Sequence, residues 1–286
     1  MNSKRRQRSW IAALALILGF LLPSFGWAEE LKGTLQIKGS DTMVNLCQAW
    51  AEAFMKRHPQ TVIAVTGGGS GTGIAALISG TCQLAASSRQ MTDKEKSKIT
   101  ARGQGWREWT VALDGLAVVV HPSNPVKQMT LSQLADLFTG KIHNWKELGG
   151  EKRAVVLLSR EVNSGTHLYF KEHVLGPGQE FAPEALLMPS SQAIADEVAT
   201  NPAAVGYYGM GYLNPKNQAV AVAKNAADAY LLPTEEQVRL GTYPIARPLF
   251  LYSIDGPKGL MKAFLDFTRS PEGQHLVSEM DFVVIQ

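Results

Sequence analysis

The chain has 286 residues, of which 45% are hydrophobic, and this is long enough to bury a substantial core. Its 28 Lys and Arg face 25 Asp and Glu, but four of the cations lie within residues 4–8. The remaining 24 cations are balanced by the acids and form no cluster, which argues against nucleic-acid binding.

The amino terminus is typical of a secretory signal peptide. The basic segment is followed by twelve apolar residues, 11–22, which are too few to span a bilayer, and by the small-x-small sequence Gly26-Trp27-Ala28. Cleavage after Ala28 removes 28 residues and leaves 258. We therefore expect a periplasmic protein, with an uncleaved membrane anchor as the alternative.

The first half of the chain alternates short apolar runs with amphipathic segments. The expected elements are strand 35–40, helix 42–58, strand 61–67, helix 70–80, strand 81–88, helix 91–103, strand 111–122 and helix 131–138, the last capped by Thr130. Strands alternating with helices indicate an α/β domain with a mostly parallel sheet.

The second half continues in the same way. Its expected elements are strand 152–160, helix 164–176, helix 192–202, strand 204–213, strand 247–254 and helix 258–270. The chain has neither a repeat of fixed period nor a Pro/Gly-rich linker between independent domains. We expect two lobes joined by continuous strands.

Three expected helices begin with the same kind of sequence. Segments 39–42 (GSDT), 70–73 (SGTG) and 163–166 (NSGT) each follow a strand and combine small residues with hydroxyl groups. Free backbone N–H groups and the positive end of the helix dipole make such a start suited to an anion. Ligands of α/β sheets bind beyond the carboxyl ends of strands, where all three segments lie.

The glycine-rich loop at 66–77 (TGGGSGTGIAAL) lacks the lysine that a nucleotide-binding loop places after its glycines. Arg160, four residues before Ser164, and Arg89, directly after Ser88, could neutralise a smaller anion instead. For each arginine alone, a salt bridge on the surface or between lobes is the alternative.

Other chemistries fit less well. The segment 71–76 matches only the loose form of a dinucleotide fingerprint, and 68–72 fails the G-x-S-x-G pattern of serine hydrolases at Thr72. His167 follows the third helix start and could serve as a base, but the histidine spacing shows no zinc motif. We expect no metal, no cofactor and no catalysis.

The chain has two cysteines, Cys47 and Cys82. In an oxidising compartment an isolated pair can form a disulfide, and two buried free thiols are the alternative.

Several motifs together resemble those of periplasmic phosphate-binding proteins that serve phosphate-specific ABC importers. They are GSDTM (39–43), GGGSGTGIAAL (67–77), LADLFTGKIHNWKELGG (134–150), SREVNSGTH (159–167), VGYYGMGYL (205–213) and FLDFTRSPEGQHLV (264–277). The resemblance covers essentially the whole chain after residue 28, and the 134–150 motif is the most specific.

The resemblance implies the type II periplasmic-binding-protein fold, with two α/β lobes joined by two crossover hinge strands near 113–120 and 247–253. We place one lobe at 29–115 plus 246–286 and the other at 116–245. Inorganic phosphate would bind between the lobes and be delivered to an inner-membrane ABC permease with its ATPase, and the protein would be a monomer.

Carried over by motif, Thr42 and Met43 would donate from the first helix start, Ser70 from the second, and Arg160 with 164–166 from the other lobe. The complete candidate set is Ser40, Asp41, Thr42, Met43, Ser70, Gly71, Ser88, Arg89, Arg160, Ser164, Gly165 and Thr166.

One departure from the family concerns selectivity. Many members carry an aspartate where this chain has Ser88-Arg89, and a carboxylate there accepts the proton of phosphate and disfavours sulfate. Asp41, Asp114 or Glu161 could take that role. A general oxyanion receptor of the sulfate type, a phosphate sensor and, less favoured, a phosphatase with 164–166 and His167 at the reacting phosphate remain the alternatives.

Overall fold

The computed structural model describes residues 31–285. The expected signal peptide lies outside these residues. Within them, no helix is both long enough and apolar enough to cross a membrane.

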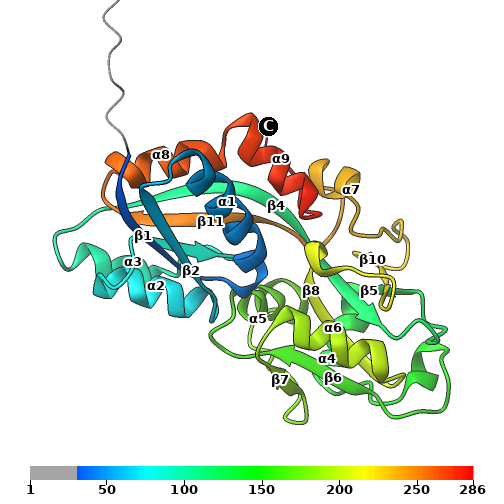
Figure 1. Ribbon diagram of the computed structural model, residues 1–286. Helices are drawn as coiled ribbons and strands as arrows, with labels where there is room; N and C mark the ends of the chain where they lie inside the picture. Colours follow the sequence, from blue (N-terminus) through cyan, green and yellow to red (C-terminus); the bar gives the residue numbers. More distant parts are fainter. Residues whose placement is uncertain (1–30, 286) are drawn as a thin grey trace, which may run out of the picture. The chain divides into compact units, whose positions relative to one another are not determined.

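A nine-stranded mixed sheet forms the centre of the fold (Figure 1). Its strand order is β2-β1-β3-β11-β4-β8-β6-β7, and β9 pairs with β4 beside this path. The strands are β1 (Gly33–Gly39), β2 (Thr61–Thr66), β3 (Leu84–Ser87), β4 (Trp106–Val120), β6 (Val156–Arg160), β7 (Leu186–Met188), β8 (Ala204–Gly209), β9 (Gln218–Ala219) and β11 (Ala246–Ile254). A small second sheet pairs β5 (Gln128–Thr130) with β10 (Ala221–Ala223).

The expected parallel pairing is confirmed at the two ends of the sheet only. Strands β2, β1 and β3 are parallel, and so are β8, β6 and β7. In the middle, β11 is antiparallel to both β3 and β4, and β4 is antiparallel to β8. The two parallel groups are therefore joined through antiparallel strands.

Strand β4 is the long connection within this sheet. Its first part, Trp106–Gly115, pairs with β11, and its last part, Leu116–Val120, pairs with β8. It begins five residues before the expected strand. Residues 106–110 extend it because they pair with β11, although their own sequence did not indicate a strand. The ranges 113–120 and 247–253, expected as crossover strands, lie in β4 and β11.

Helices cover both faces of the β1–β3 group (Figure 1). On one face α1 (Val44–Arg57) packs with α8 (Gly259–Thr268) and α9 (Pro271–Glu279), where the Phe54 ring meets Phe264 and Phe267 edge-on. On the other face lie α2 (Ser70–Ser79) and the charged α3 (Asp93–Thr100), which begins with a capping box at Thr92.

The β6–β8 group is covered in the same way. Helix α4 (Leu131–Phe138), capped by Thr130 as expected, and α5 (Gly165–Phe170) with the wide turn η3 (Lys171–Leu175) share an aromatic cluster of Phe138, Phe170 and Tyr207. Helix α6 (Ser191–Thr200) covers the opposite face. The remaining short helices are η1 (Asp41–Met43), η2 (Trp145–Leu148), η4 (Met210–Tyr212) and α7 (Glu235–Arg239).

Of the two alternatives left open for the cysteines, the structure has the free thiols, because Cys47 and Cys82 are both unbridged and buried. Cys47 belongs to the same core cluster as Leu84, whereas Cys82 belongs to the cluster of Ala85, whose side chain leaves β3 on the opposite face. Burial raises the pKa of Cys47 to about 12 and that of Cys82 to about 11, so both remain protonated thiols at neutral pH.

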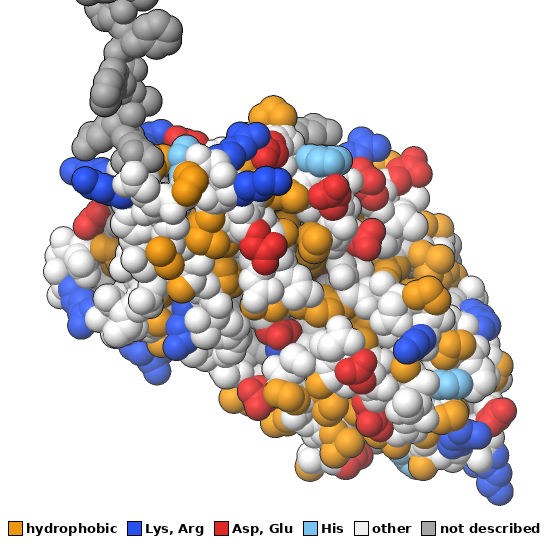
Figure 2. Space-filling model, in the orientation of Figure 1, with side chains coloured by type: hydrophobic (Ala, Val, Ile, Leu, Met, Phe, Trp, Pro, Cys, Tyr) orange, Lys and Arg blue, Asp and Glu red, His pale blue; other side chains and the backbone are white. Residues whose placement is uncertain are grey.

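Exposed charges of both signs are interspersed on the face shown in Figure 2. Several form surface ion pairs, such as Lys262 with Asp266 at 2.5 Å and Lys141 with Asp136 at 3.0 Å. Pairs that remain in water contribute little, about 0–1 kcal/mol each. The buried core and the buried ion pairs described below matter more for stability.

Candidate anion-binding site

The three helix starts singled out in the sequence meet in the structure. They are the entry to η1 after β1, to α2 after β2, and to α5 after β6. Gly69 N–H donates to the Gly39 carbonyl at 2.8 Å, and Gly71 N–H donates to the Asn163 carbonyl at 3.0 Å. The three segments therefore lie together, and their role as one anion site stays a prediction.

Four hydroxyl groups converge where the segments meet, and we call Thr42, Ser70, Ser88 and Thr166 the hydroxyl cluster. Thr42 Oγ1 lies 2.9 Å from Thr166 Oγ1, Ser70 Oγ lies 3.3 Å from Ser88 Oγ, and Ser88 Oγ lies 3.5 Å from Thr166 Oγ1. All four residues are at most 1% exposed. The cluster is therefore shielded from water and lies in a medium where hydrogen bonds are strong.

The neighbouring N–H groups fix the direction of two of these hydroxyls. Ser88 N–H donates to Ser70 Oγ at 3.0 Å, and the Arg247 guanidinium donates to Thr166 Oγ1 at 3.1 Å. Since each oxygen already accepts a hydrogen bond, its own proton is available to donate. The cluster thus presents donors, which suit an oxyanion and not a cation.

Ser40 adds a polar atom that the protein does not satisfy. Its side chain is buried, and its Oγ has no hydrogen-bond partner among the described residues. A buried polar group without a partner is rare and costs about 1–3 kcal/mol. Because Ser40 directly precedes η1 and Thr42, this orphaned hydroxyl indicates that a polar ligand or water completes the site.

Gly165 allows the closest approach between the helix starts. A Cβ atom at this position would lie 2.2 Å from Ser70 Oγ and 2.7 Å from Ser88 Oγ. Gly165 has no left-handed backbone, so the space, and not the conformation, requires glycine here.

The two arginines proposed from the sequence are held by other groups. Arg89 forms a bidentate pair with Glu95, with both N–O distances at 2.8 Å. Arg160 Nη1 lies 3.1 Å from Asp41 Oδ2, and its other N–H groups donate to the Met188 and Pro189 carbonyls. Neither guanidinium has a hydrogen bond to the hydroxyl cluster in the described residues.

Other predicted site residues have contacts of their own. Ser164 caps α5 by accepting from the N–H groups of Thr166 and His167, and Met43 N–H donates to the Ser40 carbonyl at 3.2 Å. Asp41 Oδ2 accepts from both the N–H and the hydroxyl of Ser191, at 2.8 and 2.9 Å. These residues shape the site through contacts within the protein.

Arg247 and Asp114 are the residues whose place at the site the sequence reasoning missed. Asp114 appeared only as one of three carboxylates that could read a proton, and Arg247 only within a crossover strand. Their side chains form a fully buried ion pair at 2.7 Å. The sequence could have indicated this pair, because each of two apolar strands contains one charged residue. Burying a charge is costly unless it is paired.

The three carboxylates that could accept the proton of phosphate differ in position. Glu161 is exposed, and Asp41 is bound to Ser191 and Arg160. Asp114 lies beside the cluster, because a Cβ placed on Gly209 would be within 2.9 Å of both its oxygens and 2.8 Å from Thr42 Cγ2.

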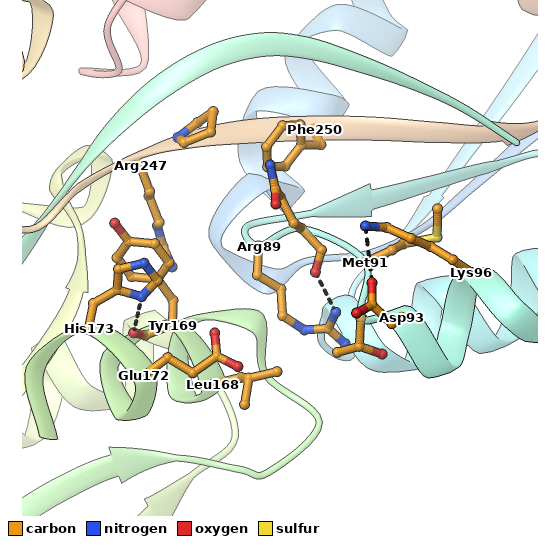
Figure 3. Close-up of a pocket in the computed structure, with 13 residues that line it drawn as sticks. Arg89, Met91, Asp93, Lys96, Leu168, Tyr169, Glu172, His173, Arg247 and Phe250 are labelled. Carbon is orange, nitrogen blue, oxygen red and sulfur yellow. Dashed lines mark hydrogen bonds and ion pairs between the residues drawn. The ribbon is translucent and has the colours of Figure 1, made fainter. Parts of the chain in front are cut away.

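A cavity of about 560 Å³ adjoins the cluster (Figure 3). Arg89, from the loop before α3, lines one side, and Tyr169 and His173 line the other as a stacked pair 3.8 Å apart. Arg247 also lines this cavity and lies over the Tyr169 ring, 5.4 Å from its centre. Arg247 therefore contacts both the hydroxyl cluster and the open space beside it.

His167 does not belong to the hydroxyl cluster. It is 9% exposed, its Nδ1 lies 3.2 Å from Ser159 Oγ, and its ring packs against Phe181. Burial lowers the pKa of His167, so the ring stays neutral in the folded protein below the pH at which an unfolded histidine is protonated. Within residues 31–285, no group of three or more His, Cys, Asp or Glu side chains could hold a metal ion.

This buried histidine predicts an acid-dependent loss of stability. As the pH falls through about 6.5, the unfolded chain takes up a proton at His167 that the folded protein does not, so the free energy of unfolding decreases. Urea denaturation at pH 7.5 and 5.5 should show a smaller pH-dependent loss for His167→Gln than for the unaltered protein. Equal losses in both proteins would show that His167 is protonated in the fold.

Comparisons with known proteins cover nearly the whole chain. A family model described as a PBP superfamily domain matches residues 28–272. The phosphate-binding protein PstS of Pseudomonas aeruginosa is 32% identical over 280 residues, covering 92% of this chain and 86% of that protein. PstS of Bacillus subtilis is 34% identical over 258 residues, covering 90% and 82%.

Solved structures agree with these sequence matches. A crystal structure from Clostridium perfringens with bound phosphate, described as a phosphate ABC transporter substrate-binding protein, has a TM-score of 0.81 at 32% identity. That match covers 89% of this chain and all of the other. A phosphate transport receptor of the ABC type from Vibrio cholerae has a TM-score of 0.72 at 29% identity, covering 88% of this chain and all of the receptor.

Proposed function

Since this chain belongs to the PBP superfamily and, within it, to the PstS family, we propose that it binds inorganic phosphate in the hydroxyl cluster for an ABC importer. The observation that carries the proposal is the convergence of three helix starts on four buried hydroxyls, two of which accept a hydrogen bond from an N–H group. The bound phosphate in the related Clostridium perfringens structure supports the same ligand.

The available donors are sufficient for tight binding. A hydrogen bond to a charged group contributes about 1.5–3 kcal/mol when it is well desolvated. A micromolar dissociation constant corresponds to about −8 kcal/mol. Hydroxyl donors from Thr42, Ser70, Ser88 and Thr166, together with Ser40, can reach this value without a metal ion.

We propose that binding closes two lobes, 29–115 with 246–286 and 116–245, about β4 and β11. Two sets of contacts across the proposed boundary support this division. Thr42 bonds to Thr166, and Asp41 binds Ser191 and Arg160. Because phosphate inside the cluster has no open route to solvent, release requires these contacts to separate, as in a hinge opening.

The cellular context completes the proposal. The amino-terminal basic and apolar segments favour export to the periplasm, with cleavage after Ala28. There the protein, as a monomer, would hand phosphate to an inner-membrane permease and its ATPase. We propose a binding protein and not an enzyme, since the PstS relatives are phosphate-binding proteins and His167 faces Ser159 instead of the cluster.

Calorimetry with ligand-stripped protein tests this function. We expect phosphate to bind with micromolar or tighter affinity and sulfate to bind much more weakly. Equal affinities would indicate a general oxyanion receptor, release of phosphate from a phosphomonoester would indicate a phosphatase, and binding of neither ion would contradict the proposed site.

Asp41→Asn is expected to weaken phosphate binding about 10-fold, mainly by speeding release. The amide removes a charge that accepts hydrogen bonds from Ser191 and pairs with Arg160 across the proposed lobe boundary, a change on the order of 1.5 kcal/mol. Stopped-flow displacement measures the dissociation rate. Asp136→Asn, which alters a surface pair with Lys141, serves as the control, and an equal rate in both variants would contradict the proposed contact between lobes.

A further inference from the structure

A buried ion pair in the two central strands adjoins the hydroxyl cluster. Arg247 in β11 lies directly opposite Asp114 in β4. Its Nε and Nη2 donate to Asp114 Oδ2 at 2.9 and 2.7 Å, and Asp114 Oδ1 accepts from Met210 N–H at 3.0 Å. Neither side chain of the pair is exposed. The guanidinium is therefore held in a single orientation.

The remaining donors of Arg247 bond to two residues of the hydroxyl cluster. Nη1 donates to the Ser88 carbonyl at 3.2 Å, and Nη2 donates to Thr166 Oγ1 at 3.1 Å. A guanidinium can only donate, so Thr166 Oγ1 must accept from it. The Thr166 proton then points to Thr42 Oγ1, 2.9 Å away, to Ser88 Oγ, 3.5 Å away, or to a ligand placed between them.

The other two buried arginines make no comparable contact. Arg89 is bound to Glu95 and to the Gln90 carbonyl, and Arg160 to Asp41, Ser191 and two carbonyls. Within the described residues, Arg247 is the arginine that bonds to members of the hydroxyl cluster, and it does so on Ser88 and Thr166 together.

We propose that Arg247, oriented by Asp114, is the positioning residue that sets the direction of the hydroxyl donors and so makes the site specific for an oxyanion. This inference rests on the proposed phosphate binding. Without the guanidinium, the acceptor position that it fills on Thr166 Oγ1 becomes free, so the Thr166 hydroxyl can rotate and its proton is no longer directed away from Arg247 toward the ligand. Arg247 thus determines affinity through Thr166 and not through charge alone.

A double-mutant cycle separates this role from a general effect on the fold. Arg247→Lys keeps the charge but replaces a planar fork of donors by a single nitrogen, so the contacts with Asp114, Ser88 and Thr166 cannot all keep their geometry. We expect phosphate to bind at least about 30-fold more weakly, or roughly 2 kcal/mol. Thr166→Val removes the hydroxyl that Arg247 orients. We expect the double variant to bind about as weakly as the weaker single variant, because both changes remove the same interaction.

Ser70 provides the matched comparison within the same cluster. Its hydroxyl accepts from Ser88 N–H and has no hydrogen bond to Arg247. The fold-losses in phosphate affinity caused by Arg247→Lys and by Ser70→Ala should therefore multiply in the double variant. Calorimetry gives each affinity, and urea denaturation shows whether each variant is folded.

The outcomes distinguish this inference from the proposed function. If the unaltered protein does not bind phosphate, the proposed function fails. Two results would overturn the inference in a protein that binds phosphate. One is an affinity of Arg247→Lys within about 3-fold of that of the unaltered protein. The other is a double variant whose loss of affinity is the product of the losses of Arg247→Lys and Thr166→Val. Should Arg247→Lys not fold, Asp114→Asn takes its place in the same cycles, with the same expected coupling to Thr166 and the same independence from Ser70.

Discussion

Gly165→Ala is expected to abolish tight phosphate binding while leaving the fold intact. Alanine suits the first turn of α5, but its Cβ would lie 2.2 Å from Ser70 Oγ and 2.7 Å from Ser88 Oγ. Overpacking of this kind costs about 1–3 kcal/mol, and relief requires moving the hydroxyls that bind the ligand. We expect the dissociation constant to rise at least about 100-fold, which is roughly 2.8 kcal/mol.

The control for this substitution is Gly256→Ala. A Cβ atom at Gly256 meets nothing within 4 Å, and its backbone is not left-handed. Calorimetry should therefore give an unchanged affinity for Gly256→Ala, and circular dichroism should show both variants folded. If Gly165→Ala binds phosphate as tightly as the control, the ligand does not sit between α5 and the hydroxyls of Ser70 and Ser88.

Arg160→Met is expected to lower the free energy of unfolding by about 3–5 kcal/mol. The side chain is 2% exposed, and its loss removes the partner of Asp41 and the donors to the Met188 and Pro189 carbonyls. Breaking a buried pair from one side has this cost because the other charge stays behind without its partner. The melting temperature should fall by roughly 6–20 °C, at about 2–4 °C per kcal/mol for a chain of this size.

Arg153→Met gives the matched comparison at the surface. Arg153 pairs with Glu151 at 3.0 Å, but both side chains are largely exposed, so its removal should cost at most about 1 kcal/mol. Urea denaturation of both variants measures the difference. Equal losses would mean that Arg160 contributes no more than a surface pair, contrary to the network described here.

Local sequence patterns predicted the parts of the fold that depend on local chemistry. The capping residue Thr130, the strands at 61–67 and 247–254, and the three helix starts were found where hydroxyls, glycines and periodic apolar residues mark them. Helix α9 was missed, although Ser270 followed by Pro271 is a strong start signal. The antiparallel centre of the sheet could not be predicted, since the pairing of β4 with β11 joins segments more than 100 residues apart.

The site was predictable in its residue types but not in its charges. The hydroxyls of Thr42, Ser70 and Thr166 follow from the helix-start motifs, and Ser88 was found beside Arg89 at the end of the expected strand 81–88. The partner of each arginine is a tertiary choice, as the pairing of Arg160 with Asp41 shows, and no local pattern specifies it. Arg247 was taken for part of a crossover strand because its contact with Thr166 exists only in the folded chain.

A crystal structure of the protein grown with phosphate would show whether the hydroxyl cluster holds the ion. We expect one phosphate within hydrogen-bonding distance of Thr42, Ser70, Ser88 and Thr166, with the Ser40 hydroxyl directed at the ion or at a water bound to it. Phosphate found instead only in the 560 Å³ cavity beside Arg89, with the hydroxyls still bonded to one another, would contradict it.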